Sequence, residues 1–149
     1  MSEPSDQRRS VFFDVNEAPD ERHTTFDPDP TGRSRPPGVM EYFAGRNQRK
    51  MAVSNPETDG LSFTIFTFAP GTLLPKHRHN VDYIEFVLAG EVHHGNRVLR
   101  PGQGVFRVAG TPYSFWAGPD GATIADFRAH TFYTTEYEDR PDEFLPHRL

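Results

Sequence analysis

Cysteine is absent from the 149-residue sequence, and its absence narrows the chemistry open to the chain. Disulfide bonds, thiolate metal sites and thiol nucleophiles are excluded, so a metal ion would have to be held by His, Asp, Glu or Tyr side chains. Long hydrophobic runs are absent too, since no stretch reaches the roughly 18 apolar residues that a membrane-spanning helix requires. The first residues also lack the charged and then apolar pattern of a secretory signal. We therefore expect a cytoplasmic protein with no membrane partner.

The sequence has no excess of positive charge. Lys and Arg total 16 against 21 Asp and Glu residues, which gives a formal net charge of −5 at pH 7. Proteins that grip the phosphate backbone of nucleic acids need clustered basic residues, and the one basic stretch, Arg46 to Lys50, is short. The composition therefore predicts no nucleic-acid partner.

The third absence is a sustained helical period of apolar residues. After about residue 46, short runs rich in β-branched and aromatic residues alternate with Gly and Pro turns, which predicts an all-β sandwich or barrel. The expected strands are Lys50–Val53, Leu61–Phe68, Lys76–His79, Tyr83–Leu88, Glu91–His94, Arg97–Leu99, Gly104–Val108, Tyr113–Trp116 and Ala122–Ala129.

The two ends of the chain differ in texture from this middle part. Residues 1–45 are expected to form an irregular extension, because Pro and charged residues crowd its first 37 positions and Pro removes backbone donors. Within it, the apolar run Val11-Phe12-Phe13 could pair at a sheet edge, including that of a partner subunit. We expect the folded domain to span 46–130 and a tail, 131–149, to pack on its outside.

A pair of histidines is the most informative local pattern. His77 and His79 are two residues apart in an expected strand, so both side chains point to the same face with their Cα atoms roughly 6.5 Å apart. Two imidazoles placed in this way can close on one metal ion, provided that a third ligand arrives from another strand. Glu85, on the next strand, is the nearest carboxylate of the right length.

The surroundings of this pair resemble a known family. Gly71, five further residues, His77-Arg78-His79 and then Val87-Leu88-Ala89-Gly90-Glu91 resemble the first motif of the cupin superfamily. The segment from Pro101 to Tyr113, a Pro-Gly turn followed by a strand and a second Gly turn, resembles the second cupin motif. The resemblance implies a jelly-roll barrel, also called a double-stranded β-helix, with a divalent metal ion or small-molecule site inside and a homodimeric assembly.

The chain departs from the family pattern at two positions. The usual glutamate position falls on Tyr83, with Glu85 two residues later, and the usual histidine position falls on Tyr113. Glu85 has the same strand parity as Tyr83 and could act as a displaced ligand. Tyr113 could itself be a metal ligand through its hydroxyl group, orient a substrate or fill the barrel, and the same alternatives hold for Tyr83.

Other side chains leave the third and fourth ligands open. His93 and His94 are neighbours in an expected strand, so at most one of them points inward. His130 shares a strand face with Asp126 and Arg128, which is either an inner or an outer face. Four aromatic residues are expected to line the pocket and to favour a planar or apolar organic ligand: Phe66, Phe106, Phe115 and Trp116.

These expectations lead to a preferred function and two alternatives. The preferred function is a metal-dependent, dioxygenase-like enzyme acting on a small organic substrate, with Fe, or else Mn, Ni or Zn, held by His77, His79 and Glu85, and with Tyr113 or Tyr83 orienting the substrate. The first alternative is a metal-independent isomerase, epimerase or cyclase in which a His and a Tyr serve as base and acid. The second is a binding or sensing module without turnover.

Overall fold

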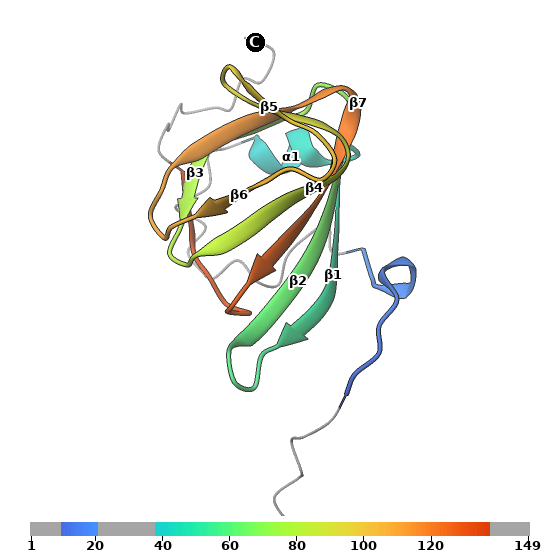
Figure 1. The fold of residues 1–149 in the computed structure, drawn as a ribbon, viewed down its shortest axis with the longest axis vertical. Helices are drawn as coiled ribbons and strands as arrows, with labels where there is room; N and C mark the ends of the chain where they lie inside the picture. The colour runs from blue at the N-terminus through green and yellow to red at the C-terminus, as the bar shows by residue number, and fades with distance from the viewer. Residues whose placement is uncertain (1–9, 21–37, 138–149) are drawn as a thin grey trace, which may run out of the picture.

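The computed structural model describes residues 10–20 and 38–137, and the strands among them form one curled antiparallel sheet (Figure 1). The all-β prediction is therefore confirmed. The helices of the described residues are the 3₁₀-helix η1 (Val15–Glu17) and the α-helix α1 (Val39–Phe43). The strands are β1 (Asn47–Asn55), β2 (Gly60–Phe68), β3 (Leu73–His79), β4 (Tyr83–His94), β5 (Arg97–Leu99), β6 (Gly104–Arg107), β7 (Tyr113–Arg128) and β8 (Thr135–Tyr137).

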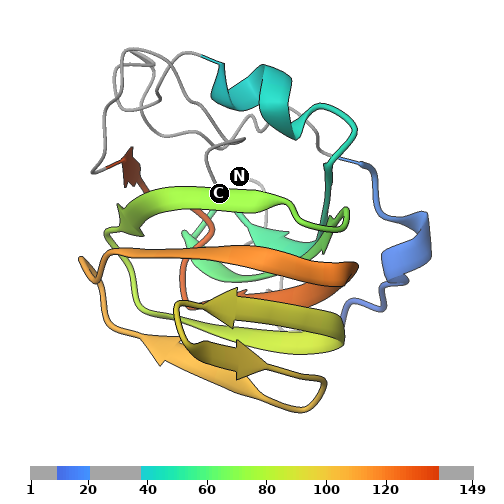
Figure 2. The ribbon, with the colours of Figure 1, turned by 90° about the horizontal axis from the view of Figure 1, so that it is seen from above.

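The long strands β4 and β7 organise the sheet. The strand order is β1-β2-β7-β3-β8, and β4 pairs with β5, β6 and β7. Seen from above, β7 lies between β3 and β4 in the curled sheet (Figure 2). Helix α1 lies outside it beside β3, where the hydroxyl of Tyr42 accepts a hydrogen bond of 2.9 Å from the backbone N–H of Leu73.

Two turns expected from the sequence are absent. Ala89-Gly90 lies inside β4, and Pro119-Asp120-Gly121 lies inside β7, so each of these strands joins two of the expected ones. The β4–β7 register shifts between Val87 and Ala89 and again between Gly90 and Val92. Irregularities of this kind let a strand bend without ending, which explains why turn-like residues here mark curvature of the barrel.

Gly90 is required at this bend. Its φ of 67° disfavours other residues, and a β carbon at this position would overlap the carbonyl of Gly121. Gly90→Ala is therefore expected to lower the free energy of unfolding by more than about 1 kcal/mol in urea titrations. The matched control is Gly95→Ala, because Gly95 has a φ of 58° but no neighbour within 4 Å of an added β carbon. Equal losses in both variants would contradict the steric argument.

The interior of the barrel has an apolar part and a polar part. The apolar part is a continuous core formed by Phe68, Val87, Val92, Leu99, Phe115, Ala117, Ala122 and Ile124. The polar part follows from the strand register, which lines up Arg107, Tyr83 and Arg128 in one row across β6, β4 and β7. The next row holds Glu85, Asp126 and Thr64, and all six of these side chains are buried. The core holds the fold together, and the polar rows define the candidate site.

Apolar side chains also form a row on the outer face of these strands. The register aligns five of them across β1, β2, β7, β4 and β6: Val53, Phe63, Phe127, Ile84 and Phe106. The rings of Phe63 and Phe127 stack with their centroids 4.6 Å apart, while Phe127, Ile84 and Phe106 are exposed. Large exposed apolar patches often mark a protein contact. The expected homodimer stays a prediction, which light scattering on the purified protein tests.

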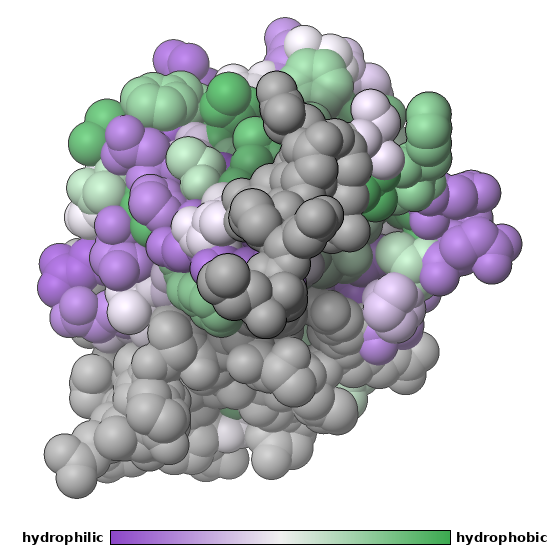
Figure 3. Space-filling view, turned by 90° about the horizontal axis from the view of Figure 1, so that it is seen from below, coloured by the Kyte–Doolittle hydropathy of each residue, from purple (hydrophilic) through white to green (hydrophobic). Residues whose placement is uncertain are grey.

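The remaining surface is mixed in character. On the part of the face that Figure 3 colours, hydrophilic and hydrophobic side chains are interspersed. Among the described residues, no helix has the length and apolar character needed to cross a membrane.

The structure describes part of each end of the chain. The run Val11-Phe12-Phe13 forms no strand, and Phe12 is 94% exposed. In the described part of the expected tail 131–149, β8 pairs with β3 and Tyr137 is buried. Residues 1–9, 21–37 and 138–149 lie outside the described residues, so the expectations that concern them stay predictions.

Candidate functional site

The two motif histidines are buried side by side at the polar end of the interior. His77 and His79 are 4% and 8% exposed, and their ring centroids are 4.8 Å apart. The Nδ1 atom of His77 lies 2.7 Å from the carbonyl oxygen of Pro75, and that of His79 lies 3.0 Å from the carbonyl oxygen of Thr134. A carbonyl oxygen can only accept, so both Nδ1 atoms carry the proton and both Nε2 atoms carry a lone pair.

The environment of these imidazoles keeps them uncharged. Burial, with the nearby positive charge of Arg107, lowers the pKa of His77 to about 4, although the hydrogen bond to the Pro75 carbonyl opposes the shift. Burial also lowers the pKa of His79 well below its ordinary value, with contributions from His77 and Arg128. At neutral pH both rings are therefore neutral, with a lone pair on each Nε2 atom.

We expect the free energy of unfolding to fall as the pH drops from about 6.5 towards 4. Over this window the unfolded chain protonates His77 while the folded protein does not, because the pKa of the folded imidazole is about 4. The unfolded state thus binds more protons, and stability is lost as the pH falls, by about 3 kcal/mol for this one shift. His79 adds to the loss. Asp126 opposes it, because burial raises its pKa to about 6 and the folded state takes up that proton first.

Urea unfolding at several values between about pH 7 and pH 4 measures this dependence. His77→Gln retains a polar side chain but cannot titrate, so its stability should depend less steeply on pH than that of the parent protein. Identical slopes for the two proteins would contradict a buried, neutral His77.

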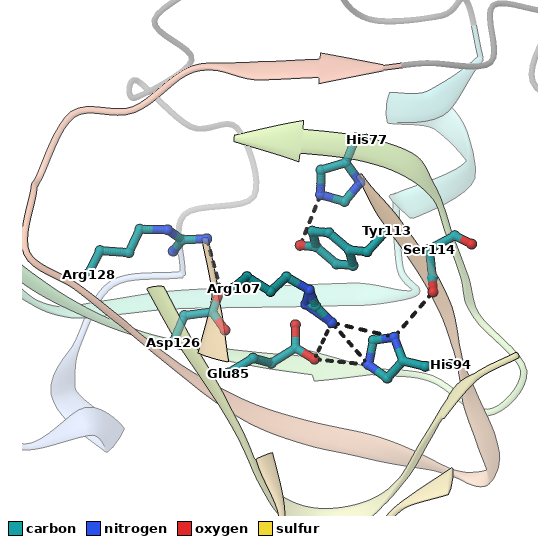
Figure 4. Close-up of polar contacts among 8 residues, drawn as sticks. All are labelled: His77, Glu85, His94, Arg107, Tyr113, Ser114, Asp126 and Arg128. Atoms are coloured by element: carbon teal, nitrogen blue, oxygen red, sulfur yellow. Dashed lines mark hydrogen bonds and ion pairs between the residues drawn. The ribbon is translucent and has the colours of Figure 1, made fainter. Parts of the chain in front are cut away.

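Tyr113 is the closest side-chain partner of the histidine pair. Its hydroxyl lies 3.0 Å from Nε2 of His77, and because Nδ1 of that ring already carries the proton, the phenol donates and the imidazole accepts (Figure 4). Burial raises the pKa of Tyr113 well above its ordinary value, and burial likewise raises that of Tyr83. Both phenols are therefore neutral donors, and neither is a ready anionic metal ligand.

Glu85 belongs to a different group of side chains. It is fully buried, and its Oε1 atom lies 3.2 Å from Nε2 of His94 and 3.5 Å from Nη2 of Arg107 (Figure 4). His94 is fixed in turn by the carbonyl oxygen of Ser114, 3.2 Å from its Nδ1 atom. Of the two neighbouring histidines, His94 thus faces inward, whereas the His93 ring lies beside Trp116 and bonds to Glu91.

A second ion pair lies on the other side of Tyr83. Nη2 of Arg128 donates a 2.9 Å hydrogen bond to Oδ2 of Asp126, and both side chains are buried. The guanidinium groups of Arg107 and Arg128 lie 5.8 and 4.6 Å from the centroid of the Tyr83 ring. The interior therefore places one buried cation on each side of this phenol.

The donor set does not fit the expected three-ligand metal ion. His77 and His79 offer two imidazole nitrogens with suitable tautomers, but within residues 10–20 and 38–137 no three His, Asp or Glu side chains converge as a metal site would require. Glu85 pairs through Oε1 with Arg107 and His94 and is not grouped with the two imidazoles. Two buried guanidinium groups near the imidazoles also repel a dication.

Other residues expected at the site lie elsewhere. Phe106 and Trp116 are 62% and 41% exposed on the outer face, so the expectation that they line the pocket is wrong. Phe115 lies in the apolar core, and Phe66 packs against that core. His130 lies beyond the end of β7, is exposed and bonds to Asp59, so it does not share the inner face of Asp126 and Arg128.

Arg107 was missed by the sequence analysis. Adjacent strand residues face opposite sides, so the expectation that Phe106 lines the pocket placed Arg107 on the outer face, whereas Phe106 is exposed and Arg107 is buried. Arg128 and Asp126 were noted as sharing a face, and the structure shows that this face is the inner one.

Solved structures of other proteins share this fold. The polyketide cyclase RemF from Streptomyces resistomycificus matches with a TM-score of 0.67 at 17% identity, over 91% of this chain and 89% of its own. An RmlC-like cupin protein from Ralstonia eutropha matches with a TM-score of 0.59 at 18% identity, over 92% and 77% of the two chains. KdgF from Halomonas sp. matches with a TM-score of 0.50 at 25% identity, over 58% and 81%.

Sequence comparison alone finds less, since no family model and no curated protein matches the chain. The fold assignment therefore depends on the curled antiparallel sheet and on its structural neighbours. Together with the inward-facing histidine pair on β3, they show that this chain has the fold of the cupin superfamily.

Proposed function

We propose that this chain is an enzyme that moves a proton on a small organic molecule inside its barrel, with His77 as the base and Tyr113 as the acid. The observation that carries the proposal is the 3.0 Å hydrogen bond between the Tyr113 hydroxyl and Nε2 of His77. A neutral imidazole and a neutral phenol in contact are a suitable pair for general acid–base catalysis.

Replacement of the Tyr113–His77 hydrogen bond by one from Tyr113 to the substrate would prepare both side chains for reaction. When a substrate carbonyl oxygen replaces Nε2 as the acceptor of the Tyr113 proton, the lone pair of His77 becomes free to take a proton from the adjacent carbon. Negative charge then develops on the carbonyl oxygen, where the phenol donates its hydrogen bond. The proton held on Nε2 then returns to the same molecule: to a different carbon in an isomerisation, to the opposite face of the same carbon in an epimerisation, or to the alkoxide oxygen formed when the enolate carbon attacks a second carbonyl group in an aldol-type cyclisation. The reaction class is therefore an isomerisation, an epimerisation or an aldol-type cyclisation.

The anchoring of the imidazole supports this role. Because Nδ1 of His77 is bound to the Pro75 carbonyl, the ring has one fixed orientation and one basic nitrogen. The structural likeness to RemF, which is described as a polyketide cyclase, supports the cyclisation branch of the proposal.

The test is the exchange of carbon-bound hydrogen for solvent deuterium. The full-length protein, treated with chelator, is incubated in D₂O with a panel of enolisable ketones and oxo acids, and loss of C–H signal is followed by NMR. We expect catalysed exchange in the parent protein and none in His77→Gln. Exchange that persists in His77→Gln, or no exchange with any compound, would overturn the proposal; capture of a compound without exchange would favour a binding module.

A metal-dependent, dioxygenase-like function is the second candidate. Its support is that both Nε2 lone pairs of the pair on β3 are turned away from the backbone, as in metal-ligating histidines. Metal analysis of the parent and of His77→Ala, after titration with Fe(II), Mn(II), Ni(II) and Zn(II), tests it. Bound ion that is lost in the variant would favour this candidate, whereas a parent protein that binds none of these ions would exclude it.

The cytoplasmic location stays a prediction from the sequence. Fractionation of cells that produce the protein at its native level tests it, and recovery outside the cytoplasm would overturn it.

A further inference from the structure

We propose that Arg107 and Arg128 form an anion-binding site that holds the carboxylate group of a small organic acid next to Tyr113 and His77. The inference deepens the proposed function, on which it rests, by naming the chemical class of the substrate. It depends on buried guanidinium groups whose hydrogen-bonding capacity the protein uses only in part.

Arg107 directs an unused donor into the interior. The side chain is 5% exposed, and its Nη2 atom is occupied by Glu85 and by the His94 ring. Its Nη1 atom is buried and has no hydrogen-bond partner among the described residues. The guanidinium carbon lies 3.6 Å from the centroid of the Tyr113 ring, so the cation is in direct contact with the proposed acid.

Arg128 repeats this arrangement on the other side of Tyr83. The side chain is 3% exposed, and Nη2 bonds to Asp126. Its Nε and Nη1 atoms are buried without a partner among the described residues. A guanidinium group matches a carboxylate through two parallel N–H donors, and together these two side chains leave three nitrogen atoms for that purpose.

The charge of the interior also favours an anion. The buried charged groups of the described residues are three guanidinium groups, Arg49, Arg107 and Arg128, against two carboxyl groups, Glu85 and Asp126. Arg49 bonds to the hydroxyl of Tyr133 and to no carboxylate that the structure describes. A buried positive charge without a counter-ion is unfavourable. A bound carboxylate would balance it and satisfy the unused donors.

The same rows of side chains offer acceptors to the rest of the ligand. Oε2 of Glu85 and Oδ1 of Asp126 are buried without hydrogen-bond partners in the described part of the chain. A hydroxyl group on the acid would satisfy one of them. The geometry therefore fits a hydroxy acid or the enol form of an oxo acid better than a plain hydrocarbon acid.

Binding measurements on the full-length protein test this site. The probes are malate, acetoacetate and benzoate, each compared with its neutral amide at millimolar concentration by thermal melting and calorimetry. We expect the acids to raise the melting temperature, with malate and acetoacetate above benzoate, and the amides to leave it unchanged. Arg107→Gln should weaken acid binding at least tenfold, as expected for loss of a buried charged partner.

The matched control is Arg78→Gln on β3. It removes the same charge from an exposed side chain that pairs with Glu136 at 2.7 Å, and acid binding should be unchanged. Arg107→Lys, which keeps the charge but loses the planar fork, should fall between the parent and Arg107→Gln, and it serves as the second variant if the glutamine variant unfolds.

The outcomes separate this inference from the proposed function. Amides that bind as tightly as acids, no melting shift with any acid, or unchanged binding in both Arg107 variants would overturn the anion site. Acids that bind through Arg107 but exchange no hydrogen would support the anion site and overturn only the proton-transfer function.

Discussion

Tyr113→Phe is expected to fold like the parent protein and to lose proton-transfer activity by a factor of roughly 10² to 10⁴. The substitution removes one oxygen atom and leaves the ring, which lies 4.4 Å from that of His77 and under the Arg107 guanidinium group. Packing and substrate binding should therefore change little, so that kcat falls while KM stays close to its original value. Deuterium exchange on a substrate identified with the parent protein measures the loss.

The control for this experiment is Tyr42→Phe. It removes a hydroxyl group that bonds to the backbone of Leu73 outside the interior, and its activity should remain that of the parent. A Tyr113→Phe variant with normal kcat would show that the phenol only fills space. A rise in KM without a fall in kcat would assign it to substrate binding alone.

Glu85→Gln is expected to lower the free energy of unfolding by about 3–5 kcal/mol, the usual cost of breaking a buried ion pair from one side. Glu85 is fully buried, and its carboxylate faces both Arg107 and His94. A neutral amide keeps the shape of the side chain but leaves the buried guanidinium group without its counter-ion. Urea unfolding at pH 7 measures the change.

Two comparisons show whether charge is the cause. Glu91→Gln, on the same strand, removes a half-exposed carboxylate that pairs with His93 and Arg100, and such pairs contribute at most about 1 kcal/mol. The double variant Glu85→Leu with Arg107→Leu removes both buried charges, and its stability should exceed that of Glu85→Gln. A double variant less stable than Glu85→Gln would mean that the loss comes from packing.

The fold could be predicted from the sequence because its signals are local. Strand runs punctuated by Gly and Pro indicated an all-β domain, and the spacing of His77 and His79 indicated two side chains on one inner face. The continuity of β4 and β7 could not be foreseen, because Gly90 and Gly121 look like turn residues. Only the pairing of β4 with β7 shows that these glycines allow the strands to bend without ending.

The candidate site could be predicted less completely than the fold, because the sequence does not show which face of a strand points inward. Adjacent strand residues face opposite sides. At most one of Phe115 and Trp116 can therefore line the pocket, as at most one of His93 and His94 can point inward. Arg107 could not be expected to face inward while its neighbour Phe106 was expected to line the pocket. Which of two faces is the inner one depends on barrel closure, which no local pattern reports.

These observations change the chemical expectation for the barrel. A metal ion in such an interior would supply positive charge to a substrate oxygen. Here Arg107 and Arg128 supply permanent positive charge at the same end of the barrel as His77. A guanidinium group binds anions without needing a vacant coordination position, whereas a metal ion needs one. We therefore expect a barrel with buried arginines to suit different reactions from a barrel with a metal ion.

The short strand β8 has a consequence for how such chains diversify. The carbonyl oxygen that orients the His79 ring belongs to Thr134, which lies beyond both sequence motifs. Insertions or deletions in this downstream segment could rotate one imidazole and change reactivity while every motif residue stayed in place. Two descendants of one ancestor could then differ in chemistry through their C-terminal segments alone.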